Sequence, residues 1–226
     1  MKLVLALEAS SRTYAVAVGA AESPQAQRAA HRDDPGFAGL GELITQTLAE
    51  AGAEFRDIGT IAVDIGPGGL STIRSVVAYA NGLAFSLGVP VFPVSSLELM
   101  AIAAEPDHPG PFLSVKRGQG GTVYAGLYRD GVMTEMRHGA PGSVLPALAG
   151  DLAEVCIAGV ARGDVAPILP GVAVVDAGIA EADILVLYRA GLAASAGSDR
   201  LVPAASPINE ASKILHESAT ASRHRL

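Results

Sequence analysis

The chain has 226 residues, of which 50% are hydrophobic and 17% are charged, and its formal net charge is −7. This composition excludes a disordered chain and leaves room for one domain or two small ones. The negative charge argues against a protein that binds nucleic acid across its own surface, because phosphate contacts need clustered Lys and Arg. An apolar start that ends at Glu8, a single Cys156 and the lack of a bilayer-length apolar run predict a cytoplasmic protein.

The first 52 residues follow the pattern of an α/β protein. Strands are expected at 3–9 and 13–19, joined by a polar turn, and a weaker one at about 25–32. A helix is predicted over 35–51, with Asp34 as its N-cap and Gly52 as its stop. Its apolar residues recur at helical spacing and include Leu40, Ile44 and Leu48.

A strand at 60–65, a glycine-rich turn and a helix over 70–87 come next. The segment that follows predicts a strand near 91–96 and a third helix through Ala104, for which Ser96 is the expected N-cap. This alternation indicates a sheet with helices packed on it.

A domain boundary is expected within the Pro-rich segment 105–111, which divides the chain into an N-terminal lobe, 1–104, and a smaller C-terminal lobe, 105–226. Beyond the boundary a strand–turn–strand pattern at 112–128 repeats the one at 3–19. The remaining expected elements are strands at 132–138, 155–160 and 172–176 and helices at 143–152 and 180–195, before a tail with little pattern after Ser198.

The turn before helix 70–87 consists of Gly66, Pro67, Gly68 and Gly69. A glycine turn that leads into a helix can hold a phosphate. Here, however, Leu70 and Ser71 stand where a Walker motif needs Lys and then Ser or Thr, and the dinucleotide spacing is missing. We therefore favour a structural turn, and for Asp64, at the strand end, a role as a turn-bonding acid over a catalytic one.

Helix 70–87 has two distinct faces. An apolar face suited to covering a sheet contains Leu70, Ile73, Val77, Ala80, Ala84 and Leu87. A stripe of small residues contains Ser71, Ser75, Ala78 and Gly82, and a second helix could approach it closely. Helix 35–51 of the same chain could pack on this stripe, and the pair of helices could still present an outer surface to a partner. For a partner, the expected interface residues are Leu40, Ile44, Leu48, Ser71, Arg74, Ser75, Ala78 and Gly82.

Other chemistry has weak support. The histidines at positions 31, 108, 138, 216 and 224 lack metal-ligand spacing, and no serine lies in a nucleophile elbow. We expect no metal, no cofactor and no catalytic residue.

The stretch at 61–101 resembles the TsaB (YeaZ) family of tRNA threonylcarbamoyladenosine biosynthesis proteins. In that family the stretch reads G-P-G-[SG]-[FL]-T-G-[LI]-R, then G-L-A, G-[IV]-P and V-S-[ST]-L. The matching positions here are Gly66, Pro67, Gly68, Leu70, Arg74, Gly82, Leu83, Ala84, Gly88, Pro90, Val94, Ser95, Ser96 and Leu97. The resemblance is specific over about 55–102 and thin beyond 130.

The resemblance implies a two-lobed α/β fold of the actin/hexokinase/Hsp70 (ASKHA) type with a duplicated mixed-sheet core. It also implies a non-catalytic subunit that forms a homodimer when alone and pairs with a TsaD-like catalytic homologue. That homologue transfers a threonylcarbamoyl group to adenosine 37 of tRNA, with a TsaE-like ATPase in the complex and tRNA contacted only indirectly. The family is often called glycoprotease-like or peptidase M22-like.

The chain departs from the family at several positions. The segment "EASSRTY" lacks the glycine of a phosphate-binding hairpin, and Glu8-Ala9 replaces the usual Asp-Thr or Asp-Ser. The family has a motif in its second lobe that contains an acidic residue. The corresponding residues here, Arg117 to Tyr124, include no acidic residue. A small nucleotide-dependent phosphotransferase or an M22-like hydrolase of the same fold stays open as the alternative, as does a divergent paralogue with another partner.

Overall fold

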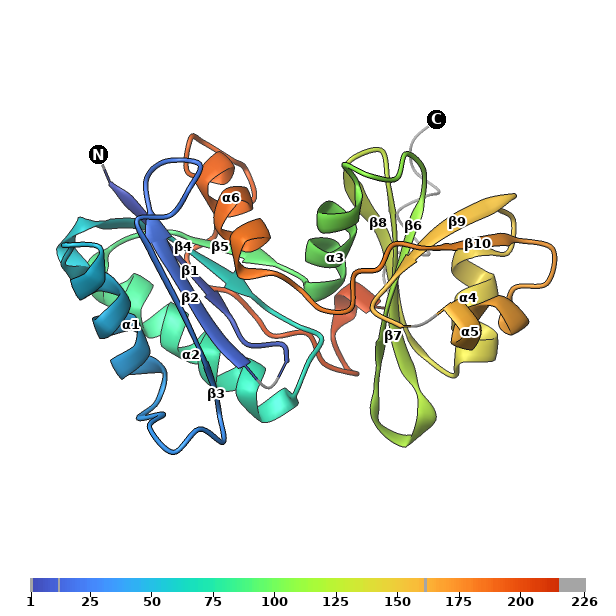
Figure 1. Ribbon diagram of the computed structural model, residues 1–226, viewed down its shortest axis with the longest axis horizontal. Coiled ribbons are helices and arrows are strands. Elements are labelled where there is room, and N and C mark those ends of the chain that lie inside the picture. Colours follow the sequence, from blue (N-terminus) through green and yellow to red (C-terminus); the bar gives the residue numbers. More distant parts are fainter. Residues whose placement is uncertain (1, 12, 161, 216–226) are drawn as a thin grey trace. The chain divides into compact units, whose positions relative to one another are not determined.

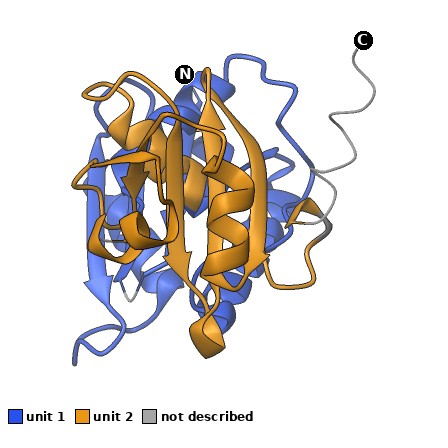
Figure 2. Ribbon diagram, turned by 90° about the vertical axis from the view of Figure 1, so that its right-hand side faces the viewer, with its two compact units in different colours: residues 1–96, 182–207 blue, residues 97–181, 208–226 orange. Residues whose placement is uncertain are grey.

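The computed structural model describes residues 2–11, 13–160 and 162–215 (Figure 1). These residues form two compact units, each described by itself (Figure 2). Among these residues, unit 1 comprises those from 2–96 and 182–207, and unit 2 comprises those from 97–181 and 208–215. The expected boundary at 104/105 divides the chain once, whereas the chain here enters unit 2, returns to unit 1 at Ala182 and leaves it again after Pro207.

Unit 1 contains a five-stranded mixed sheet in the order β3-β2-β1-β4-β5. Strands β1 (Leu3–Glu8), β2 (Thr13–Gly19) and β3 (Ala26–His31) are antiparallel, and β4 (Ile58–Asp64) and β5 (Val91–Val94) run parallel to β1. The register pairs Leu5 with Val18 on one side and with Ile61 on the other. The hairpin expected at 3–19 is confirmed.

Helices cover both faces of this sheet (Figure 1). Leu3, Leu5 and Leu7 of β1 pack in one apolar cluster with α1 (Leu40–Glu50) and α2 (Leu70–Leu87). On the opposite face α6 (Ile184–Ala194) lies so close to β4 that a Cβ at Gly191 would stand 2.6 Å from Cβ of Ala62. Leu3, Leu5 and Leu7 thus lie on one face of β1, and the residues between them face the side of α6. This is the period of two expected for a strand that is covered on both faces.

Unit 2 repeats the same topology in the order β8-β7-β6-β9-β10. The antiparallel strands are β6 (Phe112–Arg117), β7 (Val123–Arg129) and β8 (Val132–Gly139), while β9 (Glu154–Ala158) and β10 (Ala173–Asp176) are parallel to β6. The second hairpin expected at 112–128 is therefore confirmed, and the weak sequence repeat reflects a duplicated sheet.

The helices of unit 2 also lie on the two faces of its sheet. Helices α4 (Pro141–Ala149) and α5 (Arg162–Val165), with the 3₁₀ turn η3 (Ala166–Ile168), pack on the face that carries Leu113 and Val115. On the other face, α3 (Ser96–Ala104) contributes Ala101 and Ala104 to a cluster with Phe112 and Tyr128. Short 3₁₀ turns also occur at η1 (Phe55–Asp57), η2 (Gln119–Gly121) and η4 (Lys213–Leu215).

Helix α1 begins later than expected, at Leu40 instead of residue 35. The Asp34 carboxylate accepts from the backbone N–H of His31, and the Asp34 N–H donates to the His31 carbonyl, so Asp34 closes a turn and does not cap the helix. Gly39, with φ +109°, then separates that turn from the helix. The stop at Gly52, with φ +63°, lies where it was expected.

The tail after Ser198, which has little sequence pattern, makes backbone and side-chain hydrogen bonds within unit 1. Val91 and Val202 exchange backbone hydrogen bonds of 2.8 and 2.9 Å, so the tail pairs with the edge of β5. Farther along, the Asn81 side chain donates to the Ala205 carbonyl at 2.9 Å and accepts from the Ala205 N–H at 2.8 Å. Residues 216–226 lie outside the described residues.

The described residues include no helix that is both long and apolar enough to cross a membrane.

We predict that Asn81→Ala releases this tail, because it removes both hydrogen bonds to Ala205 and costs about 1–3 kcal/mol of unfolding free energy. Urea unfolding together with amide hydrogen exchange tests this, and the Ala205 amide should exchange faster while the Leu5 amide in the sheet keeps its protection. Gln46→Ala removes an exposed amide that contacts only Glu42 among the described residues and serves as the control. Unchanged exchange at Ala205 in Asn81→Ala would contradict the prediction.

Candidate interface on helix α2 and the turn that positions it

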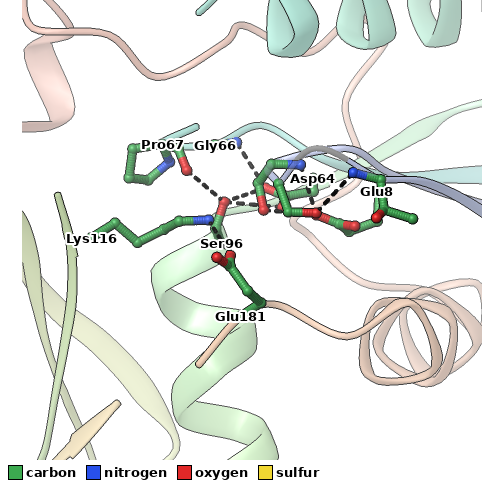
Figure 3. Close-up of polar contacts among 10 residues, drawn as sticks. Glu8, Asp64, Gly66, Pro67, Ser96, Lys116 and Glu181 are labelled. Carbon is green, nitrogen blue, oxygen red and sulfur yellow. Dashed lines mark hydrogen bonds and ion pairs between the residues drawn. The ribbon is translucent and has the colours of Figure 1, made fainter. Parts of the chain in front are cut away.

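A buried carboxylate holds the turn between β4 and α2 (Figure 3). Asp64 is fully buried, and its Oδ1 accepts from the N–H of Gly66 at 2.7 Å. The Ser96 hydroxyl lies 2.9 and 3.0 Å from the two carboxylate oxygens and 3.0 Å from the Pro67 carbonyl. The Ser96 N–H donates to the Gly66 carbonyl at 2.8 Å. Asp64 thus bonds the turn, as the sequence analysis favoured.

Two of the turn glycines are required by geometry. Gly66 has φ +90°, a conformation that side chains with a Cβ rarely adopt. At Gly68 an added Cβ would lie 2.6 Å from the carbonyl oxygen of Ser10, so the turn rests directly on the β1–β2 hairpin. Gly69 has ordinary space around it. Close backbone packing therefore accounts for Gly66 and Gly68 without a bound phosphate.

The hairpin under the turn is held in a similar way. Glu8 is buried, and its Oε1 accepts from both the N–H and the hydroxyl of Ser10 at 2.7 Å. The carboxylates of Glu8 and Asp64 are therefore both engaged in backbone turns. Ser96, expected as an N-cap, is the first residue of α3 and directs its hydroxyl to Asp64 and Pro67.

Helix α2 has one buried and one exposed face. The buried residues are Thr72, Ile73, Val76, Val77, Ala80 and Ala84. The expected interface residues Ser71, Arg74, Ser75, Ala78 and Gly82 are all exposed. Leu70, expected on the apolar inner face, is 40% exposed because it lies at the start of the helix, beyond the sheet that covers Ile73.

The exposed face of α2 carries few charges. Arg74 is the single charged residue among its 18 residues. Phe85 is 89% exposed and Tyr79 36%. Phe85 continues the spacing of Ser71, Ser75, Ala78 and Gly82 by three positions, a signal that the sequence analysis overlooked. We call these five residues with Arg74 and Tyr79 the α2 surface.

Helix α1 does not cover the α2 surface. Gly41 of α1 lies at the border of that surface, where an added Cβ would stand 3.2 Å from the Tyr79 hydroxyl. An added Cβ at Gly82 would meet nothing within 4 Å. The alternative that helix 35–51 packs on the small stripe is therefore wrong.

The expected contribution of α1 to the interface needs correction. Ile44 and Leu48 are buried in the core of unit 1, at 0% and 2% exposure, and Leu40 is half-buried against that core. A partner could reach Ile44 or Leu48 only by opening the unit. The apolar spacing of this helix reflects packing on its own sheet, as amphipathic helices of globular proteins generally do.

The remaining candidate groups are structural. Burial raises the pKa of the Cys156 thiol, as do the nearby Asp176 and Glu154 carboxylates, which disfavours a reactive thiolate. Within the described residues, no three His, Cys, Asp or Glu side chains form a group that could hold a metal ion. His216 and His224 lie outside these residues.

The fold places the chain in a recognised class. Two five-stranded sheets with one strand order, each with helices on both faces, define the two-lobed α/β proteins of the actin/hexokinase/Hsp70 type. The structure is similar to YeaZ from Pseudomonas aeruginosa, with a TM-score of 0.74 and 26% identity over 92% of this chain and 100% of that one. In fold and in sequence the chain is thus similar to the TsaB (YeaZ) family.

Sequence comparisons find similarity to TsaD proteins as well as to TsaB proteins. Residues 38–145 match the family model of TsaD, tRNA N6-adenosine threonylcarbamoyltransferase. A TsaB protein of Haemophilus influenzae is 37% identical over 62 residues, which is 27% of this chain and 26% of that protein. The tRNA N6-adenosine threonylcarbamoyltransferase of Chlorobium limicola is 28% identical over 95 residues, 39% of this chain and 27% of that enzyme. The chain thus spans about a quarter of the length of the curated relatives that it matches.

We predict that Asp64→Ala lowers the unfolding free energy by about 2–4 kcal/mol, since the Gly66 N–H and the Ser96 hydroxyl both lose a buried acceptor. Asp64→Asn keeps one carbonyl oxygen at the same place and should cost less than half as much. Urea unfolding measures both variants, with Asp33→Ala, at an exposed acid, as the control. If Asp64→Ala and Asp33→Ala lowered the free energy of unfolding equally, the buried contacts of Asp64 would not stabilise the turn.

Proposed function

We propose that this chain is a non-catalytic scaffold subunit in tRNA threonylcarbamoyladenosine biosynthesis. Its task is to bind and position a TsaD-like catalytic homologue, which transfers the threonylcarbamoyl group to adenosine 37 of tRNA. The observation that carries the proposal is the α2 surface, an exposed helix face with small residues, one aromatic anchor at Phe85 and a single charge.

Three properties of the α2 surface favour a protein partner. Small side chains allow the backbone of a second helix to approach closely. An 89% exposed Phe85 offers an anchor of the kind that concentrates binding energy in protein interfaces. Arg74 has no ion pair within the part of the chain that the structure describes, so its guanidinium is available to a carboxylate of the partner.

The sequence comparisons support a TsaD-like partner. The TsaD family model matches residues 38–145, which contain α1, α2 and α3. A TsaD-like homologue would then carry a helix equivalent to α2 and could pack it against this one about a pseudo-twofold axis. A second copy of this chain satisfies the same geometry, so we propose a homodimer when the partner is absent.

The chain's own carboxylates support a scaffold more than an enzyme. Glu8 and Asp64, the acids nearest the turns that could serve catalysis, accept hydrogen bonds from backbone and hydroxyl groups of their own unit. The net charge of −7 supports indirect contact with tRNA, through the partner. We place the assembly in the cytoplasm and include a TsaE-like ATPase in it, as the family resemblance implies.

We predict that Gly82→Arg separates the subunits and prevents capture of the TsaD-like homologue. The substitution fits the isolated chain, because a Cβ there meets nothing within 4 Å, but it puts a bulky unpaired charge into a closely packed interface. Association should weaken at least tenfold. Sedimentation velocity measures the homodimer, and copurification of the coexpressed pair measures the complex.

The matched control is Ala193→Arg, which puts the same side chain on an exposed position of α6, across the sheet from α2. Melting temperatures of both variants show whether the fold is intact. Association as tight as the wild type in Gly82→Arg, or loss of association in Ala193→Arg, would show that the interface does not lie on α2.

The isolated chain should bind no ATP·Mg²⁺ tightly in titration calorimetry and should hydrolyse none. Tight binding that Asp64→Asn or Glu8→Gln abolished would favour the phosphotransferase alternative instead.

A further inference from the structure

Unit 2 contains a pocket of about 440 Å³ at the end of the sheet where β6 stops and β7 starts. Its floor is aliphatic, formed by Val115, Val123, Leu145 and Val165, which are nearly fully buried. These four residues come from two strands and two helices. A pocket of this size with apolar walls is in the range that binds small organic molecules.

The rim of the pocket is polar. The Arg117 guanidinium pairs with the Asp164 carboxylate at 2.6 Å, and the two side chains are 74% and 51% exposed. Exposed ion pairs of this kind contribute little energy, so a ligand can replace Asp164 at low cost. The guanidinium has five N–H donors, and Asp164 is its one partner among the described residues, so the others can bind an anionic group.

The loop beside Arg117 is held in shape by its own hydrogen bonds. The Gly118 N–H donates to the Thr122 carbonyl at 2.8 Å, and the Thr122 hydroxyl donates to the Gln119 carbonyl at 2.7 Å. Gly120 and Gly121 have φ of +61° and +76°, which allows this tight return between the strands. The rim is therefore formed before a ligand arrives.

The corresponding place in unit 1 is closed. There the connection after β4 rests on the β1–β2 hairpin, with no room for a Cβ between Gly68 and Ser10. In unit 2 the topologically equivalent connection after β9 leads to Val160 and Asp164, which line the pocket opposite the β6–β7 hairpin. The connection after β9 is also closely packed at Gly159, where an added Cβ would lie 2.2 Å from the Val115 carbonyl oxygen. The pocket lies beyond this glycine, where Val160 and Asp164 line it.

We propose that this pocket binds a small organic anion, whose apolar body lies on the aliphatic floor and whose carboxylate or phosphate group pairs with Arg117. The site is distinct from the α2 surface and does not depend on the proposed scaffold function.

Two fluorescent probes of the same shape class test this on the full chain. 1-Anilinonaphthalene-8-sulfonate carries an apolar body and one anionic group, and N-phenyl-1-naphthylamine has the same body without the charge. Arg117→Gln should weaken binding of the sulfonate about tenfold and leave the neutral probe unchanged. The matched control Arg129→Gln, at the exposed far end of β7, should change neither.

A second variant tests the apolar floor. Val160→Phe places a larger side chain at the pocket wall and should weaken both probes, while circular dichroism checks that the variant folds. Methyl NMR of the unaltered chain locates the probe independently of any variant. Shifts should concentrate on Val115, Val123, Leu145 and Val165.

Competition distinguishes the head groups. Displacement of the sulfonate probe by octanoate assigns a carboxylate ligand, and displacement by phenyl phosphate assigns a phosphate. The proposal is overturned if neither competes, if Arg117→Gln and Arg129→Gln have equal effects, or if the methyl shifts lie on unit 1.

Discussion

The hydrogen-bonded burial of the Asp64 carboxylate is the constraint on which the geometry of unit 1 depends. A carboxylate removed from water is costly unless donors surround it, and here the Gly66 N–H and the Ser96 hydroxyl supply them. These contacts join the end of β4, the turn and the start of α3. Since the turn is fixed at both ends, the first residue of α2 and the direction in which the helix leaves the sheet are fixed as well.

The position of α2 decides which of its side chains reach solvent. Ile73, Val77 and Ala84 point to the sheet, so Ser75, Gly82 and Phe85 point away from it. A helix face of this kind in a monomeric protein usually carries charged residues, whereas α2 has Arg74 alone. The physical basis of the proposed scaffold role is therefore a face of small residues with the exposed Phe85 and a single charge, which the chain itself leaves uncovered.

The two sheets share one topology and differ in how the strand-to-helix connection meets the first hairpin. In unit 1 a glycine allows backbone to lie on backbone, and the space is filled. In unit 2 the loop between β6 and β7 has five residues, 118–122, against four, 9–12, between β1 and β2, and an aliphatic pocket lies beside it. Duplication of a fold thus does not duplicate its surfaces, since these depend on the side chains and glycines at the ends of the strands.

Period-two alternation, glycine and proline punctuation and the repeated strand–turn–strand pattern determined the order of elements, both hairpins and the limits of α2, because these features are local. Local pattern failed where a distant contact decided the outcome. The tail after Ser198 is held by Val91 and Asn81, and the chain returns to unit 1 at Ala182. At Asp34 the competing contact is local, because a turn with His31, three residues earlier, takes the place of the expected helix cap. Ile44 and Gly82 were both expected at the interface, but the sheet covers Ile44 and leaves Gly82 exposed. That distinction belongs to the tertiary structure, since burial depends on which elements pack together and not on the sequence of any one of them.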